Sequence, residues 1–384
     1  MLKSNKNSKF TLGILGGGQL AKMTMLEAYK MGLDVAIIEN GELSPAGNLT
    51  KYEFASKIEI NPDLDKFIEK SDIITLENEF IDPSIIEYIE KSCSVFPSSK
   101  TLSLIQDKLI QKTTFDNAGI SVANFAQIEN HEDLKVFGEK YGYPYVLKTR
   151  KFGYDGYGNY TAKSLEDAII GFSKFKEKNA DIYAEAFVNF TKELAVMVVR
   201  NKDGEIKTYP VVETVQKNHI CKEVYAPANI SEKSINEAKE LAIKCVEVIN
   251  GVGVFGIESF LLPNGEIVVN EIAPRPHNSG HYTIEACHTS QFENIIRAVC
   301  NLPIGSTDMR VGAACMINIL GEINGSGVPA NINELLSFDK AKFHLYGKET
   351  SRIGRKMGHI TVTGDNLEAT INYAKEAANS LKWE

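Results

Sequence analysis

The first hundred residues alternate short apolar runs with segments of helical periodicity. The apolar runs are TLGILGG (11–17), DVAIIE (34–39), DIITLE (72–77) and CSVFP (93–97), and runs of this kind are typical of strands that are buried on both faces. Between the first two, QLAKMTMLEAYKMG (19–32) repeats apolar residues at the spacing of a helix. This alternation predicts βαβ units on a parallel sheet.

Beyond about residue 105 the pattern becomes a mixture of helices and alternating strands. A helix over 103–119 and a strand over 143–149 precede a glycine-rich stretch, KFGYDGYGNY (151–160). After it we expect a helix over 164–176, three strands over 181–188, 193–201 and 206–215, and a second helix over 234–249. Residues 253–275 then predict a hairpin that turns at Pro263, Asn264 and Gly265.

The 384 residues are too many for one ordinary core, so we expect more than one domain. The fold class is α/β and α+β, in three packed pieces without internal repeats. These are a Rossmann-like domain over 1–105, a central domain over 106–300 and a small, mostly β domain over 301–384. The first part of the central domain, about 106–180, is expected to form a lid.

Composition and charge narrow the function. The net charge of −8 argues against broad nucleic-acid binding, which needs a basic surface. No apolar run approaches the length of a membrane span, and the polar N-terminus lacks the apolar region of a signal peptide. The six cysteines form no C-x-x-C pair. We therefore expect a cytoplasmic protein with reduced, mostly buried thiols and small-molecule partners.

A glycine loop follows the first strand. Gly16, Gly18 and Ala21 fit the pattern G-x-G-x-x-[G/A], and Glu39 lies about twenty residues on, as in dinucleotide-binding proteins. Amides at the start of a helix suit a phosphate. The alternative is that the glycines only permit a tight turn and close helix packing. The pattern indicates phosphate but does not specify a nicotinamide.

A second glycine-rich stretch, residues 151–160, has a different character. It lacks the G-K-[ST] ending of a P-loop, so it resembles a flexible cover over phosphates. Lys148, at the end of the preceding strand, could reach those phosphates. The alternative is a solvent-facing lysine beside a surface turn.

Two carboxylates carry the strongest chemical signal. Glu258 and Glu271 fall on the two strands of the predicted hairpin, six residues before Asn264 and seven after it, so we expect them to be cross-strand neighbours. Facing carboxylates repel unless a cation lies between them, and oxygen ligands point to Mg²⁺ or Mn²⁺ held jointly with substrate phosphates. Otherwise they would be solvent-facing glutamates on an edge hairpin.

His277 and His281 have the spacing of a zinc-binding helix. However, Pro276 and the intervening Asn-Ser-Gly predict a loop, so the spacing loses its meaning. A polar loop, RPHNSGHYT (275–283), that contacts a small substrate is the better interpretation.

Together these features resemble the ATP-grasp superfamily. The strings LGGGQLAKM, LKTRKFGYDGYGNY, NEIAPRPHNSGHYTIEAC and YGKETSRIGRKMGH resemble its N5-carboxyaminoimidazole ribonucleotide synthase family, and the likeness runs from about residue 9 to the end. The resemblance implies a ligase of purine biosynthesis that uses ATP and Mg²⁺. It would join bicarbonate to 5-aminoimidazole ribonucleotide through carboxyphosphate, yielding ADP and phosphate, and it would be a homodimer.

The resemblance also implies roles for individual residues. The ATP site would comprise Lys108, Lys148, Gly153, Tyr154, Asp155, Gly156, Tyr157, Gly158, Asn159, Glu185, Ala186, Phe187, Val188, Glu193, Gln216, Asn270 and Glu271. The metal ligands would be Glu258 and Glu271. The ribonucleotide and bicarbonate would be bound by Gly18, Gln19, Leu20, Asn278, Ser279 and Arg355, and the catalytic residues would be Glu77, Tyr154, Arg275 and Lys348.

The chain departs from the family pattern at two positions. Gln216, in the string ETVQ, stands where relatives often carry histidine, and glutamine cannot change charge near neutral pH. Asn159 stands where glutamine is more usual. Neither change removes a charged group that the chemistry needs.

Three other functions compete with this interpretation. A formate-using glycinamide ribonucleotide transformylase shares the nucleotide machinery, although HNSGHYTIEAC favours the carboxylating enzyme. A dinucleotide oxidoreductase should bind NADH. A catalytically inactive nucleotide-binding regulator should lack the metal carboxylates, and both are present.

Overall fold

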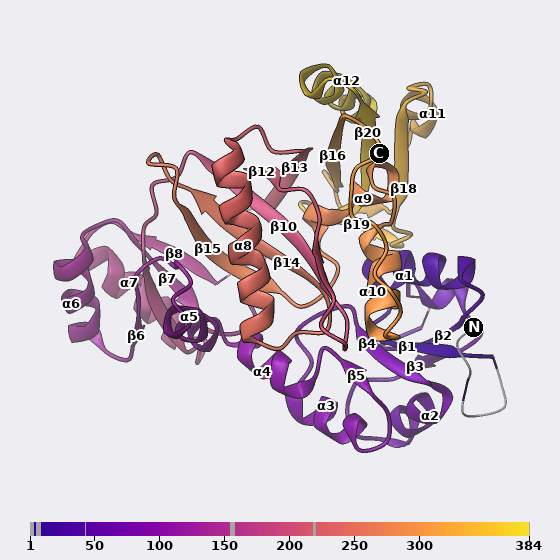
Figure 1. The fold of residues 1–384 in the computed structure, drawn as a ribbon. Helices are drawn as coiled ribbons and strands as arrows, with labels where there is room; N and C mark the ends of the chain where they lie inside the picture. The colour runs from indigo at the N-terminus through magenta and orange to yellow at the C-terminus, as the bar shows by residue number, and fades with distance from the viewer. Residues whose placement is uncertain (1–3, 5–8, 43, 154–157, 218–219, 384) are drawn as a thin grey trace.

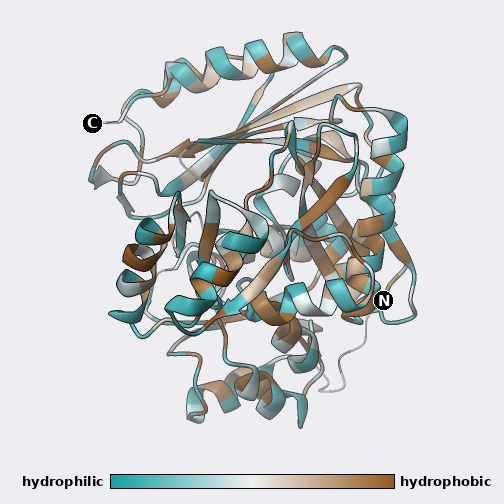
Figure 2. Cartoon of the chain, turned by 90° about the vertical axis from the view of Figure 1, so that its left-hand side faces the viewer, coloured by the Kyte–Doolittle hydropathy of each residue, from teal (hydrophilic) through white to brown (hydrophobic). Residues whose placement is uncertain are grey.

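The computed structural model describes residues 4, 9–42, 44–153, 158–217 and 220–383. A helix-covered sheet at the N-terminus lies beside a large central sheet, and a smaller sheet lies on the far side of the large one (Figure 1). The last strands and the final helix extend the molecule at the other end. Apolar segments concentrate in the strands, whereas the outer helices carry hydrophilic residues on their exposed sides (Figure 2).

The N-terminal sheet is parallel, with strand order β3-β2-β1-β4-β5. All four strands expected from the apolar runs are confirmed. The strands are β1 (Thr11–Leu15), β2 (Asp34–Glu39), β3 (Glu53–Ala55), β4 (Ile73–Leu76) and β5 (Val95–Phe96), and the helices are α1 (Gln19–Lys30), α2 (Pro62–Lys70) and α3 (Pro83–Glu90). The missed strand, β3, lies at the sheet edge and is only three residues long (EFA), which is too short to stand out as an apolar run.

The helix expected over 103–119 is wrong as one element, because the structure has two helices, α4 (Ser99–Gln106) and α5 (Lys108–Asn117). Asp107 separates them in an extended conformation. Its carboxylate accepts from the backbone N–H groups of Leu109 and Ile110 and pairs with Arg150 at 2.7 Å. This cap starts a new helix in a direction that places Lys108 near the large sheet.

The smaller sheet is antiparallel, with order β6-β9-β7-β8. It comprises β6 (Phe125–Ile128), β7 (Tyr145–Thr149), β8 (Asn159–Ala162) and β9 (Ile182–Ala186), covered by α6 (His131–Tyr141) and α7 (Leu165–Lys176). Buried Leu134, Phe137, Leu147 and Phe172 lie in its core. The glycine-rich stretch therefore joins two neighbouring strands, β7 and β8.

The large sheet has nine strands in the described part of the chain, in the order β15-β14-β10-β12-β13-β16-β20-β18, with β11 paired to β10. The strands are β10 (Lys192–Arg200), β11 (Ile206–Thr208), β12 (Val212–Lys217), β13 (Ile220–Ala226), β14 (Gly253–Leu261), β15 (Ile267–Ala273), β16 (Ala313–Leu320), β18 (Ala341–Leu345) and β20 (Lys356–Gly364). Because β16 pairs with β13, the C-terminal strands continue the sheet of the central part.

Helices cover both faces of the large sheet. They are α8 (Glu232–Val248), α10 (Gln291–Val299) and α12 (Leu367–Ser380), while α9 (Thr283–Ala286), α11 (Ile332–Leu336), β17 (Gly325–Ser326) and β19 (Thr350–Ser351) are short connecting elements. The apolar residues of α1 and of α10 belong to one buried cluster, which joins the N-terminal sheet to the large one. Cys221, Cys245, Cys287 and Cys315 are buried thiols, as expected.

Candidate functional site

The hairpin of β14 and β15 places Glu258 directly opposite Glu271, which confirms the expected cross-strand pair. The register shifts by one residue between Glu258 and Ser259, because Ser259 pairs with Val269 and leaves Asn270 without a cross-strand partner. The sequence spacing of six and seven residues about Asn264 thus corresponds to a β-bulge at Asn270. Bulges commonly re-aim side chains beside active sites.

The two carboxylates are electrostatically unequal. Burial and the neighbouring Glu271 raise the pKa of Glu258 to about 8. Burial also acts to raise the pKa of Glu271, but the Lys108 ammonium, which donates a short hydrogen bond to it, outweighs burial and lowers that pKa to about 2. Two facing carboxylates repel each other when both are charged, so the pKa of one rises while the other stays ionised.

The residues present fit a hard cation. Asn270 Oδ1 is a buried atom without a hydrogen-bond partner among the described residues, and it lies in the bulge next to Glu271. Two carboxylates and an amide oxygen form an oxygen-only donor set, which suits Mg²⁺ better than zinc. Among the described residues, no three His, Cys, Asp or Glu side chains lie together so that they could hold a metal ion by themselves. Substrate phosphates would have to complete the shell.

A buried charge cluster lies on the side of the small sheet. Lys148 donates to Glu185 at 3.0 Å, and Lys112 reaches the other oxygen of Glu185 at 3.2 Å. Burial opposes ionisation of Glu185, but the two ammonium groups lower its pKa to about 2. Tyr183 adds a hydrogen bond to the same carboxylate at 3.3 Å. The Glu185 side chain is therefore occupied by lysines, and Lys148 is held at the end of β7.

Residues 186–188, at the end of β9 and just after it, form the segment in which the adenine contacts were expected. The Ala186 N–H donates to Asn124 O at 2.8 Å within the small sheet. Phe187 is exposed, and Val188 is half-buried. On the large sheet, burial raises the pKa of Glu193, and the nearby Gln216 side chain acts in the opposite direction. The structure thus brings these two predicted nucleotide residues together.

The predicted phosphate cover is described only at its ends. Asn159 pairs with Lys148 across β7 and β8, and the Gly158 carbonyl accepts from Thr149 N–H at 2.8 Å. Gly158 has φ +87°, a conformation that favours glycine. Tyr154, Asp155, Gly156 and Tyr157 lie outside the described residues.

The first glycine loop is occupied by the protein's own carboxylates. The N–H groups of Gly18 and Ala21 donate to Glu77 at 2.7 and 2.8 Å, and the Gly17 N–H donates to Glu39 at 2.9 Å. A Cβ at Gly18 would lie 2.5 Å from Glu77 Oε1. The lack of a side chain at Gly18 therefore leaves room for the Glu77 carboxylate. The amides of Gly17, Gly18 and Ala21 are already used by carboxylates, so a phosphate on this loop could bind only the remaining amides. Among the described residues, no carboxylate accepts from the amides of Gln19 and Leu20.

The loop after β15 is packed tightly around its predicted residues. Arg275 forms a two-pronged ion pair with Glu79, whose Oε1 lies 3.0 Å from Nη2. The Asn278 amide exchanges hydrogen bonds with the amide of Asn318, one of them 2.8 Å long. Ser279 Oγ lies 2.8 Å from Nδ1 of His277. The Asn278 and Ser279 side chains thus serve to hold the loop in this structure.

His277 and His281 lie in the predicted loop, not on one helix face, because residues Asn278–Gly280 form a short 3-10 turn. Burial, followed by the charge of Arg275, lowers the pKa of His277 to about 3, so its ring is neutral. Nδ1 accepts from the Ser279 N–H at 3.4 Å, which leaves the proton on Nε2, 3.6 Å from Glu258 Oε1. His281 instead pairs with Gln291 at 3.0 Å.

The basic C-terminal segment, residues 346–359 (YGKETSRIGRKMGH), contains a lysine, Lys356, that the family motifs did not assign to the site. Lys348 donates to the Lys356 carbonyl at 2.7 Å, and Arg355 donates to the Thr350 carbonyl at 2.8 Å. Lys356, at the start of β20, exerts its charge on Glu258 and His277. Other contributors that were missed are Gln111, Lys112, Glu79 and Asn318. All depend on contacts between distant segments, which the sequence does not reveal.

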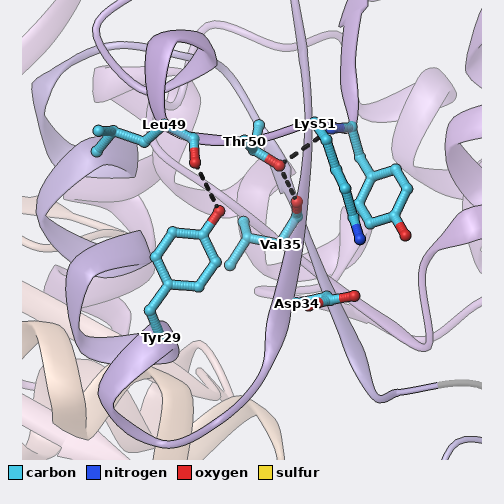
Figure 3. Close-up of a pocket in the computed structure, with 7 residues that line it drawn as sticks. Tyr29, Asp34, Val35, Leu49, Thr50 and Lys51 are labelled. Carbon is cyan, nitrogen blue, oxygen red and sulfur yellow. Dashed lines mark hydrogen bonds between the residues drawn. The ribbon is translucent and has the colours of Figure 1, made fainter.

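Two surface pockets flank the N-terminal sheet. One, of about 280 Å³, lies at the start of β2 beside Tyr29, Thr50 and Lys51 (Figure 3). The second, of about 500 Å³, lies at the carboxyl ends of β2 and β4 and is lined in part by Glu39 and Phe80. Since ligands of open parallel sheets bind at the carboxyl ends of the strands, only the second adjoins the candidate site.

The comparisons with known proteins agree with this geometry. Residues 9–106 match the ribonucleotide synthetase preATP-grasp domain, residues 113–292 the ATP-grasp domain, and residues 314–373 the phosphoribosylaminoimidazole carboxylase C-terminal domain. The fold and the paired carboxylates define the chain as an ATP-grasp ligase.

Relatives narrow the class further. The N5-carboxyaminoimidazole ribonucleotide synthase of Bacillus subtilis is 38% identical, covering 91% of this chain and 90% of that protein. The carboxyaminoimidazole ribonucleotide synthase of Aspergillus clavatus, solved with ATP, has a TM-score of 0.89 at 36% identity, over 97% of this chain and 98% of that one. The corresponding synthetase of Thermotoga maritima has a TM-score of 0.86 at 42% identity, over 98% and 99% of the two chains. The chain belongs to the N5-carboxyaminoimidazole ribonucleotide synthase family, ligases of purine biosynthesis.

Some relatives are longer. The phosphoribosylaminoimidazole carboxylase of Ogataea methanolica is 39% identical over 97% of this chain, and the match spans 70% of that protein. The match with the Schizosaccharomyces pombe protein of the same name spans 66% of its length. The chain thus spans about two thirds of these fungal relatives.

Proposed function

We propose that the β14–β15 hairpin is where this chain carries out the ligation, with ATP bound between the small sheet and the large one. The observation that carries the proposal is the facing pair Glu258 and Glu271, with Lys108 beside it and the charge of Lys148 acting on Glu271. Carboxylates and ammonium groups in one place suit a divalent cation and a triphosphate. Mg²⁺, when bound by Glu258 and Glu271, would neutralise charge on the phosphates.

The reaction consists of two transfers. A bicarbonate oxygen attacks the γ-phosphorus of ATP, and the bond from that phosphorus to the bridging oxygen breaks, giving ADP and carboxyphosphate. The exocyclic amine of 5-aminoimidazole ribonucleotide then attacks the carboxyl carbon of carboxyphosphate or the CO₂ released from it. By either route the bond from that carbon to the phosphate oxygen breaks, and the amine proton leaves with the phosphate. Lys108 and Lys148 supply fixed positive charge where negative charge accumulates.

The remaining nucleotide contacts follow from the arrangement of the strands. Backbone groups of Phe187 and Val188 are proposed to contact the adenine, since the Ala186 N–H is engaged in the sheet. Glu193 is proposed to bind the ribose hydroxyls, with Gln216 orienting its carboxylate. Residues 153–159 are proposed to cover the phosphates.

The ribonucleotide is proposed to lie between the start of α1 and the basic C-terminal segment. The amides of Gln19 and Leu20 and the side chains of Lys348 and Arg355 would bind its phosphate. Arg275 is proposed to contact bicarbonate, and Glu77 to fix the loop that presents the α1 amides. Loss of ribonucleotide binding on removing Arg355 would support this placement.

Two further properties are proposals. The family resemblance suggests a homodimer, which sedimentation velocity at micromolar concentration would test. No helix in the described part of the chain is long and apolar enough to cross a membrane, and buried thiols are consistent with residence in the cytoplasm.

The decisive experiment measures ADP formation with Mg²⁺ and bicarbonate, with and without 5-aminoimidazole ribonucleotide. We expect ADP and the carboxylated ribonucleotide to appear in equal amounts when all substrates are present. Product formation with formate in place of bicarbonate, or the absence of ribonucleotide-dependent ADP release, would refute the proposal.

A further inference from the structure

Strand β15, which carries Asn270 and Glu271, lies at the edge of the large sheet. Among the described strands of that sheet, only β14 pairs with it, along one side. Near its middle, the Val269 N–H donates to the Ser121 carbonyl at 2.8 Å. Further partners on that strand are supplied by side chains of α5. Backbone groups at a buried edge need such partners, because leaving them unpaired costs free energy.

On one side of the bulge, the partner of the β15 backbone is the side chain of Gln111. Its Oε1 accepts from the Ile272 N–H at 3.3 Å, and its Nε2 lies 3.5 Å from the Ile272 carbonyl. The same Nε2 donates to the Ile105 carbonyl at 3.0 Å. The Gln111 side chain is only 2% exposed. Its amide therefore pairs with both backbone groups of Ile272, as a residue on a neighbouring strand would.

Lys112 performs the equivalent task on the other side. Its Nζ lies 3.4 Å from the Val269 carbonyl and 3.2 Å from Glu185 Oε2. The Lys112 side chain is also 2% exposed. Consecutive residues of one helix thus hold Val269 and Ile272, and only Asn270 and Glu271 stand between those two points.

We propose that Gln111 and Lys112 are positioning residues that fix the bulge and thereby aim Asn270 and Glu271 at the metal. A bulge carries one unpaired residue, and a slip of register by one residue would turn each side chain to the opposite face. Contacts on both flanks hold the bulge at Asn270. Lys112 also holds Glu185, which binds Lys148. One helix therefore links the metal ligands to the nucleotide side of the site.

The inference rests on the proposed metal site, so the test separates the two. The probe is Mn²⁺ with ADP, and free Mn²⁺ is measured by electron paramagnetic resonance. For Gln111→Met, we expect the dissociation constant of Mn²⁺ in the presence of ADP to rise about tenfold or more, the usual scale for residues that orient metal ligands. Binding of ADP without metal should stay within about twofold of wild type on the same reasoning.

A matched control removes a buried amide elsewhere. Asn294 donates to Tyr209 at 2.7 Å and accepts from the Gly305 N–H at 2.9 Å, without contacting β15. Asn294→Met should lower thermal stability and leave Mn²⁺ affinity at the wild-type value. If Gln111→Met behaves like this control, its role is only structural and the inference is wrong.

Two further variants complete the design. If wild type shows no ADP-dependent Mn²⁺ binding, or Glu271→Gln retains it, the proposed metal site fails whatever Gln111 does. If both behave as expected and Gln111→Met binds Mn²⁺ normally, the positioning role alone fails. Should Gln111→Met not fold, Lys112→Met removes the other flanking contact and is judged by Mn²⁺ affinity alone, because Lys112 also contacts Glu185 on the nucleotide side.

Discussion

Replacing Glu271 by glutamine removes one charge from the facing pair while keeping the side-chain shape. Lys108 loses the carboxylate that it now contacts, and a metal ion would lose one of its two anionic ligands. We expect Mg²⁺-dependent turnover of ATP to collapse without loss of the fold, because the pairing of β14 with β15 and the contacts of Gln111 and Lys112 with β15 do not involve the Glu271 side chain.

The size of the effect follows from the charge that Glu271 would hold next to the transferred phosphate through the metal ion. Removing one electrostatic contact to a transition state costs about 3 kcal/mol of activation free energy. About 3 kcal/mol corresponds to a loss of at least about a hundredfold in rate. The Glu271 side chain is 37% exposed, so its removal leaves no fully buried ammonium group and the fold is retained.

The assay is the initial rate of ADP release with bicarbonate and 5-aminoimidazole ribonucleotide at saturating Mg²⁺. Glu266→Gln is the matched control, because Glu266 is an exposed residue of the same hairpin. The Glu266→Gln variant should release ADP at the wild-type rate. Circular dichroism confirms that both variants are folded. A Glu271→Gln rate within a few-fold of wild type would refute the assignment of the metal site.

Three further predictions concern the rest of the site. Arg355→Ala should raise KM for the ribonucleotide about tenfold or more, the scale of a lost charged hydrogen bond, and leave KM for ATP unchanged; equal effects on both would contradict the placement. Asn318→Leu should raise KM for the ribonucleotide but not for ATP, since Asn318 holds Asn278; unchanged kinetics would show that the loop holds without it. The lysines that lower the pKa of Glu185 from 4.5 to about 2 stabilise the fold above pH 4.5 by about 3 kcal/mol, and this contribution is lost as pH falls toward 2. The difference in melting temperature between wild type and Glu185→Gln should therefore be constant above pH 6 and narrow toward pH 3.5; a difference that widens with acid would refute the charge cluster.

Local sequence patterns were sufficient for the parts of the site that lie within one strand or one hairpin. Glu258 and Glu271 could be paired from the sequence because a short hairpin brings them together and its turn residues fix the register. The buried strands β1, β2 and β4 were equally accessible, since each is an apolar run between polar residues. The family strings added candidate nucleotide-binding residues, which no periodicity reveals.

Contacts between distant segments could not be predicted. Glu77 lies 59 residues from the Gly18 amide that it accepts from, and the loop pattern alone pointed to a phosphate at that position. The break at Asp107 was missed because its cause, the ion pair with Arg150, is 43 residues away. Gln111 and Lys112 look like ordinary helix residues, and only their burial against β15 shows what they contact.

The continuity of the large sheet has a consequence for synthesis of the chain. Glu223 of β13 pairs with Ile317 of β16, so β13, a central strand of the large sheet, gains its second neighbour from residues made 94 positions later. Until β16 emerges from the ribosome, the edge of β13 has no strand beside it, and unpaired edges favour aggregation. The large sheet can therefore be completed only after β16 has been synthesised, and a nascent chain stalled before β16 should depend on chaperones.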